Sequence, residues 1–554
     1  VINASYFRDL YNYKENIVDT DSPRWDFRLD QQITTGRQGI ITNMDSNSDR
    51  YVIDLFATYN TTIAKKHNVG VLVGYNQEYC KSWWFNARKA GLISLSTPVL
   101  TAASDLQSSD GGKDDYAMRS YFGRINYDYA GKYLFEANVR MDGSSRFAPG
   151  NRWGTFPSFS AAWRISEEAF WEDLKPIVDN LKIRASWGRL GNNGIGNYDW
   201  QNVYSPANTS FGDAIQQGVW TTAIANRDIS WEKTDVVDLG LDVNLFGSLS
   251  LTFDYYNKLT HGILYRNPIP YVNGGLGAPM INSAKVRNRG FEFSASYNKN
   301  FGDLGFAVSV NGAYNRNEII DYKGDYLEIN GATVWTEGQP IGKFYMREID
   351  HIVQDKAEID KLVSEGWTFS PSRPEPGDFL YKDLNNDKRI DDKDRVLKGQ
   401  PLPLFTFGGS IAFSYKNFDL SALFSGVAGW DRYLSTGIFS LTNADTERLF
   451  LKKFQNQWSE TNRNTNIPKL YASNEKNNQV SDYYLYDASF LRLKTLQLGY
   501  TLPKNLIPKV RIRAYCNLEN YFTITSYPGM DPEMNGDVGY PILKTVSLGV
   551  NIKF

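Results

Sequence analysis

The residues best suited to chemistry lie in one short acidic stretch, DLNNDKRIDDKD (383–394). Calcium loops place oxygen ligands at positions 1, 3, 5, 7, 9 and 12, the seventh through a backbone carbonyl. Oxygens with this spacing come from Asp383, Asn385, Asp387, Arg389, Asp391 and Asp394. The spacing predicts a calcium loop, in which the ion stiffens the backbone and takes no part in catalysis.

Two residues of this stretch depart from the calcium-loop pattern. Lys388 occupies the position of the turn glycine, and Asp394 replaces a bidentate glutamate. The alternative is an acidic surface turn whose Asp and Asn side chains accept hydrogen bonds from their own backbone. The sequence leaves both interpretations open and indicates no requirement for another cofactor.

Outside this acidic stretch, few residues in the chain could support catalysis. The chain has three histidines (His67, His261, His351) and two cysteines (Cys80, Cys516). Neither a Ser–His–Asp arrangement nor a paired acid and base can be drawn from them. With 60 basic and 62 acidic residues the net charge is −2, which gives no electrostatic reason to expect nucleic acid binding. We therefore expect a protein that is not an enzyme.

The elements that position these residues show a two-residue period. In the last ten residues, TVSLGVNIKF (545–554), apolar and polar residues alternate strictly and a phenylalanine comes last. The same period occurs in SLSLTFDYYNKL (248–259) and PLFTFGGSIAFSYK (403–416). Successive side chains of a strand point to opposite faces, so we expect strands with one apolar and one polar face. Most of these segments are long enough for a tilted strand to cross a bilayer, which takes about 9–11 residues.

Composition favours a large β-protein. Aromatic residues make up 14% of the chain, glycine occurs 45 times, and no run of 18 apolar residues predicts a membrane helix. The polar faces carry Ser, Thr, Asn, Asp and Gly, as a wet interior would, and aromatic residues gather at the strand ends. The pattern predicts an all-β fold, a transmembrane antiparallel up-and-down β-barrel. The alternative is a soluble β-rich protein with its apolar faces in a dry core.

Connections between the strands are of two kinds. Tight turns are expected at 129–132, 246–249 and 415–418. Long polar loops are expected at about 80–118, 191–230, 260–288, 316–402 and 429–489. Short turns at one rim and long loops at the other are typical of outer-membrane barrels. We count about sixteen strands, or about 16–18 with residues 1–50, in a single β-barrel domain that covers residues 1–554.

Two points stay open at this level. The apolar positions of FLRLKTLQLGYTL (490–502) change parity, which either a bulge or a place for Arg492 and Lys494 among the lipid headgroups would explain. Tryptophans in the long loops could stack on a substrate or pack the loops together. They are Trp200, Trp220, Trp231, Trp335, Trp367, Trp430 and Trp458.

Several motifs resemble those of one family. They include GRINYDYAGKYLFEANVRMDGSSRFAPGNRWGTFPSFSAAWRISEEAFW (123–171), LKIRASWGRLGNN (181–193), NRGFEFSASY (288–297), PGDFLYKDLNNDKRIDDKDR (376–395) and DASFLRLKTLQLGYTLP (487–503). From about residue 50 to the terminal Phe554, the chain resembles the barrel of SusC-like TonB-dependent outer-membrane transporters. The resemblance implies a barrel of about 22 strands closed by an N-terminal plug. We expect that plug, its TonB-contacting segment and the first strands to lie outside this chain.

The resemblance also implies function and partners. It predicts a multi-pass protein of the cell outer membrane that imports oligomeric nutrients, either glycan or peptide. The implied partners are a SusD-like surface lipoprotein acting as a lid, TonB through the plug, outer-membrane lipid, and the barrel assembly machinery through Phe554. The alternative function is a non-transporting outer-membrane barrel that acts as a receptor or adhesin.

Overall fold

The computed structural model describes most of the chain. It describes residues 2–17, 23–26, 31–34, 39–93, 98–212, 214–267, 269–270, 272, 274, 276–322, 328–435, 439–441, 451–471, 476–503, 505–506, 510–534 and 539–554.

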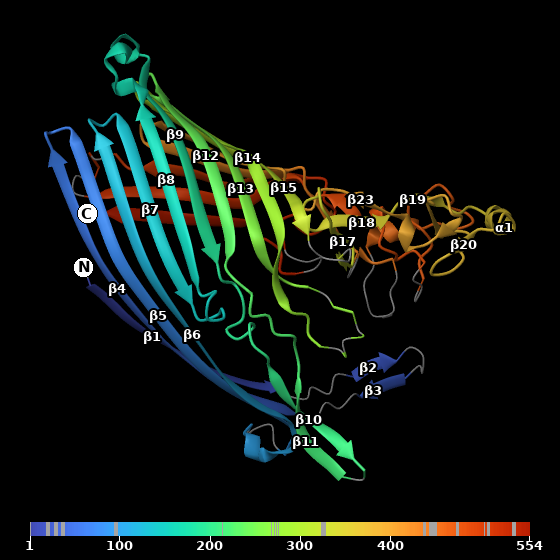
Figure 1. Cartoon of the computed structure of the whole chain (residues 1–554). Helices are drawn as coiled ribbons and strands as arrows, with labels where there is room; N and C mark the ends of the chain where they lie inside the picture. Colours follow the sequence, from blue (N-terminus) through green and yellow to red (C-terminus); the bar gives the residue numbers. More distant parts are fainter. Residues whose placement is uncertain are drawn as a thin grey trace.

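One antiparallel sheet of sixteen strands forms the body of the molecule and curves into a trough (Figure 1). Its strands pair in chain order, as an up-and-down topology requires. They are β1 (Ile2–Ile17), β4 (Ile40–Ile63), β5 (His67–Leu92), β6 (Ala103–Tyr129), β7 (Tyr133–Ser144), β8 (Trp153–Arg164), β9 (Val178–Asn192), β12 (Glu232–Leu245), β13 (Leu249–Arg266), β14 (Met280–Phe301), β15 (Leu304–Tyr322), β24 (Phe405–Tyr415), β25 (Phe418–Ala428), β28 (Phe490–Thr501), β29 (Arg511–Thr525) and β30 (Thr545–Lys553). The all-β antiparallel prediction is confirmed.

The two rims of the sheet differ as predicted. Three tight hairpins join Tyr129 to Tyr133, Leu245 to Leu249 and Tyr415 to Phe418 at one rim, which we call the short-turn rim. Their central residues take positive φ, for example 55° at Ala130 and 72° at Gly131, as the turns that match strand twist require. The long connections leave from the opposite rim, which we call the long-loop rim.

One predicted loop is a pair of strands. Residues 80–118 were expected to form a polar loop, yet β5 and β6 continue through most of this stretch, with Cys80 opposite Tyr116 and Trp84 opposite Gly112. β5 and β6 are 26 and 27 residues long. Polar side chains on both faces suit a ladder that stands in water beyond the membrane, so polarity did not mark the end of the strands.

A β-bulge accounts for the parity change in β28. The register of β28 shifts against both neighbouring strands at Lys494, which has no partner in either ladder. The Arg492 side chain is fully buried, and its Nη2 donates to Asp531 Oδ2 at 2.6 Å. The structure therefore decides for the bulge, and a loop over the sheet holds the Arg492 guanidinium instead of lipid headgroups.

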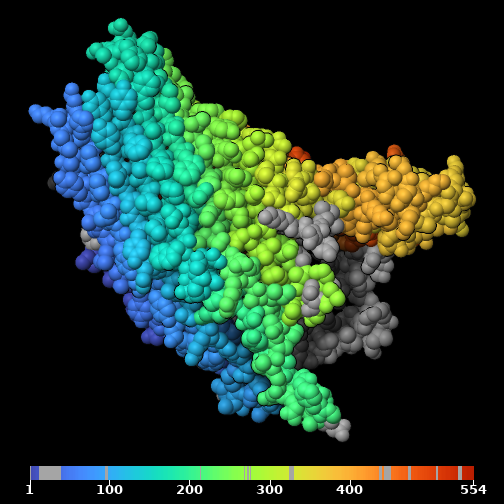
Figure 2. All heavy atoms as spheres, viewed as in Figure 1, coloured from blue at the N-terminus to red at the C-terminus, as the bar shows by residue number. Residues whose placement is uncertain are grey.

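A second folded unit stands on the long-loop rim. Its strands are β16 (Glu328–Asn330), β17 (Thr333–Trp335), β18 (Lys343–Arg347), β19 (Ile349–Ile352), β20 (Thr368–Phe369), β21 (Phe379–Tyr381), β22 (Arg389–Ile390), β23 (Arg395–Lys398), β26 (Asp431–Tyr433) and β27 (Leu485–Asp487). With helix α1 (Lys356–Ser364), they make what we call the loop subdomain, the described residues of 328–404 and 429–489. Figure 2 shows it projecting from the sheet.

The loop subdomain has a hydrophobic core of its own. Two connections far apart in the chain contribute to this core. Its buried residues are Ile352, Phe379, Tyr381, Ile390, Leu441, Phe454, Trp458, Ile467 and Tyr484. The stretches predicted as separate polar loops, 316–402 and 429–489, therefore fold together into one packed unit.

The remaining elements are short. Hairpins are formed by β2 (Pro23–Asp26) with β3 (Gln31–Thr34) and by β10 (Tyr204–Phe211) with β11 (Ala214–Thr221). The 3-10 helices are η1 (Leu100–Ala102), η2 (Ile165–Glu167), η3 (Ala169–Leu174), η5 (Asp392–Asp394), η7 (Lys452–Asn456) and η8 (Asp482–Tyr484). Among the described residues, no helix has both the length and the apolar character that a membrane span needs.

Candidate functional site

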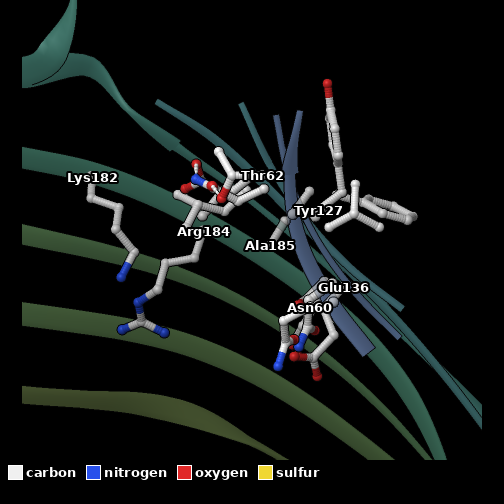
Figure 3. A pocket seen from close by; sticks show the side chains of 18 of the residues that line it. Asn60, Thr62, Tyr127, Glu136, Lys182, Arg184 and Ala185 are labelled. Atoms are coloured by element: carbon white, nitrogen blue, oxygen red, sulfur yellow. Dashed lines mark hydrogen bonds between the residues drawn. The ribbon is translucent and has the colours of Figure 1, made fainter. Parts of the chain in front are cut away.

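The inner face of the sheet carries a polar hollow near the short-turn rim. The hollow has a volume of 770 Å³ and is lined across β4 to β9 and β12, with Asn60, Glu136 and Arg184 among the lining residues. In Figure 3, Tyr127 points away from the side on which Asn60, Glu136 and Arg184 lie. Polar side chains thus line the inside and aromatic ones the outside, as the alternation predicted.

A cluster of charged residues crosses this hollow. Arg184 donates from Nε to Asp242 Oδ2 and from Nη2 to Asp254 Oδ2, each at 3.0 Å. Lys182 Nζ also lies 3.0 Å from Asp242 Oδ2, and Asp238 Oδ1 lies 3.7 Å from Arg184 Nη1. Two cations face three carboxylates on adjacent strands, so the surface offers both donors and acceptors to a polar solute.

Further charged pairs line the inner face towards the long-loop rim. Arg140 Nε donates to Asp142 Oδ1 at 2.6 Å and its Nη2 to Ser120 Oγ at 2.9 Å. Arg50 Nε on β4 lies 2.8 Å from Glu78 Oε1 on β5. The inner face is thus polar over its full height and suits the passage of hydrated molecules.

Most loop tryptophans pack the loops together. Trp231 is buried in a cluster with Phe147, Phe156, Ile195 and Ile229, and Trp200 packs against it. Trp367 and Trp458 belong to the loop-subdomain core, Trp430 packs against a third buried cluster, and Trp335 contacts Tyr265 and Tyr322. Trp220, on β11, is the exposed exception among the seven. For six of the seven, the structure thus shows the packing that the sequence had left as one of two options.

The predicted calcium loop lies on the loop subdomain. Asp383 Oδ2 accepts from the backbone N–H of Lys388 at 2.9 Å, and Asp387 Oδ1 accepts from that of Arg389 at 2.8 Å. Similar bonds orient Asn385, Asp391 and Asp394, of which Asp394 is fully buried. Lys388 adopts φ of 61°, the left-handed conformation that glycine supplies in calcium loops.

The side-chain bonds to the backbone are those of the Asx-turn alternative, whereas the left-handed conformation of Lys388 is that of a calcium loop. Within the part of the chain that the structure describes, no group of three or more Asp, Glu, His or Cys side chains could hold a metal ion. Asn385 and the Arg389 carbonyl are oxygen donors outside that set of residue types. The calcium site therefore stays a prediction.

Ion pairs connect strands and turns of the subdomain next to this loop. Arg347 is buried and donates to Ser370 O at 2.7 Å and to Asp392 Oδ1 at 3.1 Å. Partial burial by itself would raise the pKa of Asp392, but Arg347 and Arg395 outweigh it, and the pKa of Asp392 is lowered. Sequence reasoning missed this pair because Arg347 ends strand β18 and Asp392 lies in η5, 45 residues further along the chain, with no shared motif.

His351 joins β19 to helix α1. Its Nδ1 lies 2.9 Å from Asp350 Oδ2, and its Nε2 bonds to Glu358 on the first turn of the helix. Burial lowers the pKa of His351, but the bonds to Glu358 and Asp350 outweigh burial and raise the pKa above its ordinary value. The histidine therefore holds α1 most firmly in its charged form.

Comparisons with known proteins agree on one family. The family model described as "TonB dependent receptor-like, beta-barrel" matches residues 3–520. TonB-dependent receptor P3 of Formosa agariphila is 32% identical over 547 residues, covering 92% of this chain and 52% of the relative. TonB-dependent receptor SusC of Bacteroides thetaiotaomicron is 31% identical over 466 residues, covering 79% of this chain and 44% of SusC.

A solved structure has a similar fold. A structure of the RagAB peptide transporter superposes with a TM-score of 0.82 at 26% identity, covering 99% of this chain and 59% of that chain. This chain spans about half the length of the relatives it matches.

Proposed function

The chain belongs to the TonB-dependent receptor-like β-barrel family, and from this premise we propose that it forms most of the wall of an outer-membrane importer of oligomeric nutrients. It is a SusC-like barrel of the outer membrane. The chain spans only part of its relatives. We therefore propose, and do not infer from family membership alone, that the complete protein imports nutrients with the help of partners.

The observation that carries the proposal is the inner face of the sheet. It combines a 770 Å³ hollow with alternating cationic and anionic groups around Arg184, Asp242 and Asp254. A surface that presents donors and acceptors of both charges suits hydrated oligomers, whether glycan or peptide. The name of SusC gives no substrate, whereas the RagAB neighbour is described as a peptide transporter.

The partners follow from the same family membership. We propose that a SusD-like lipoprotein covers the long-loop rim as a lid, and that TonB acts through a plug outside this chain. Phe554 is 98% exposed at the end of β30, where it is available to the barrel assembly machinery. The surrounding lipid contacts the apolar outward face of the strands.

Uptake by a deletion strain tests the proposal. The strain would carry the complete protein that contains this chain, either unchanged or with Arg184→Met, and would receive labelled oligosaccharides and labelled peptides. We expect energy-dependent uptake of one class, slowed several-fold by Arg184→Met, because the variant leaves Asp242 and Asp254 without their guanidinium partner. Val139→Leu on the outward face is the matched control and should leave uptake unchanged. A deletion that impairs neither uptake would favour the receptor or adhesin alternative.

A further inference from the structure

A second hollow lies on the outward face of the sheet, away from the transport path. Its volume is 330 Å³, and it is lined by residues that include Gln77, Arg119, Gly143, Arg152 and Trp153. Gln77, Arg119, Gly143 and Trp153 lie opposite one another in one row across β5, β6, β7 and β8. One face of four neighbouring strands therefore builds the floor of the hollow.

Rows of outward side chains fix the depth of this hollow in the membrane. The aromatic row of His67, Tyr129, Tyr133 and Trp163 marks the short-turn rim, and the row of Tyr75, Tyr121 and Met141 lies nearer the long-loop rim. The stretch of β5 between them, 67–75, has the roughly 9–11 residues that a tilted strand needs to cross the bilayer. The row of Arg119 follows immediately, so the hollow lies at headgroup level on the long-loop side.

Two guanidinium groups at the hollow have donors to spare. Within the described residues, neither Arg119 nor Arg152 forms an ion pair with a carboxylate. Arg152 Nε donates to the backbone carbonyl of Phe147 at 3.2 Å. Both arginines are exposed on a face that otherwise turns apolar towards the bilayer. An arginine fork binds phosphate with two parallel hydrogen bonds.

The aromatic wall of the hollow continues into the apolar band. The Trp153 ring stacks on Tyr121 at 6.0 Å between centroids and covers Gly143, where an added Cβ would lie 3.0 Å from the indole. Below Tyr121 the outward face continues through Gly123 and Ile125. A ligand at this place therefore meets cations at one end and hydrocarbon-like surface at the other.

We infer that this hollow binds the phosphate group of a phosphorylated glycolipid of the outer leaflet, with the acyl chains lying along the apolar rows beneath Tyr121. The inference rests on the proposed function in one respect, namely that the long-loop rim faces the outside of the cell. A free phosphate ion would use the arginines alone, whereas an amphiphile uses both the arginines and the apolar rows.

Native mass spectrometry of the complete protein, purified in detergent, tests the inference. The probes are lipid A with one phosphate, the same lipid A without phosphate, and inorganic phosphate as competitor. For Arg119→Ala/Arg152→Ala we expect binding of the phosphorylated lipid to weaken by about tenfold or more, because each charge-assisted hydrogen bond lost is worth roughly that factor. Lys66→Ala, a basic residue at the other rim of the same strands, is the matched control and should bind as the unchanged protein does.

Three results would overturn the inference. They are equal binding by the double variant, equal binding of the phosphate-free lipid, and displacement of the lipid by millimolar inorganic phosphate, which would indicate a site for the free ion. Arg119→Lys/Arg152→Lys keeps the charge but loses the fork, so it should weaken binding by less than the alanine pair and covers the case in which the alanine pair does not fold. Uptake by the double variant should be unchanged, so loss of lipid binding and failure of the import proposal can be told apart.

Discussion

The sheet and the loop subdomain bury apolar side chains in opposite ways. On the sheet, residues such as Ile125 and Phe135 are about half exposed and point outward. In the subdomain, residues such as Leu441 and Phe454 are almost fully buried among one another. The sheet has lipid as the solvent for its apolar face, while the subdomain stands in water and must make its own core. Apolar side chains of the same chain thus face lipid on the sheet and one another in the subdomain, and the change occurs at the long-loop rim.

Removing a core ring from the subdomain should break this contrast most strongly. Phe454→Ala is expected to destabilise the subdomain by about 3–5 kcal/mol, because the substitution loses burial and leaves a cavity. The sheet should stay folded, so limited proteolysis should cut within 328–404 or 429–489 while the heat-modified mobility of the barrel is unchanged. Phe135→Ala, which faces lipid, is the matched control and should not increase cleavage. Equal cleavage in both variants would mean that the two regions do not differ in this way.

A charge placed on either face of one strand tests the sheet itself. Ile125 lies in the middle outward row and Asn126 lines the inner hollow. Ile125→Arg should cost about 2–4 kcal/mol, because arginine then lies near the midplane of the bilayer. Asn126→Arg should leave the unfolding free energy nearly unchanged, because its side chain is in water. Denaturant titration in vesicles measures both, and a larger cost for Asn126→Arg would reverse the assignment of the faces.

The pH should affect the subdomain through His351. Because the pKa of His351 is raised in the folded state, its stabilising contribution is complete below about pH 6.5 and is lost as the pH rises through the folded value. Hydrogen exchange of 350–364 should therefore be faster at pH 8.5 than at pH 5.5, after correction for the intrinsic rate. His351→Asn should remove the difference. A pH dependence that persists in His351→Asn would assign the effect to another group.

Calcium should have the smallest effect, confined to 383–394. If the loop binds the ion, millimolar calcium should slow hydrogen exchange there, and Asp383→Asn/Asp387→Asn should abolish that protection. Glu365→Gln, nearby but outside the loop, is the control. Exchange that is indifferent to calcium would leave the acidic Asx turn as the correct interpretation.

Some of this architecture could be predicted from single segments. The alternation in 248–259 and 403–416 is local, and it identified both the strands and their wet and dry faces. The tight turn at 129–132 was equally local. The change of parity in 490–502 was visible in the sequence. Only the position of Asp531, which binds Arg492, showed that a bulge and not a contact with lipid headgroups explains it.

The loop subdomain and the sites were harder to predict for a physical reason. Polarity predicted loops at 80–118 and 316–402, because a strand or a small core standing in water needs few apolar residues. The cluster around Arg184 depends on the register of β9, β12 and β13, and the hollow at Arg119 depends on that of β5 to β8.

The sequence by itself determined the class of fold, the two faces of each strand and the family resemblance, since a two-residue period and a motif are properties of neighbouring residues. Only the tertiary structure decided which distant loops share a core, which charges meet across the inner face and where two arginines converge on the outer one. Those contacts depend on register and on the path of the chain, and side chains far apart in sequence carry no local record of them.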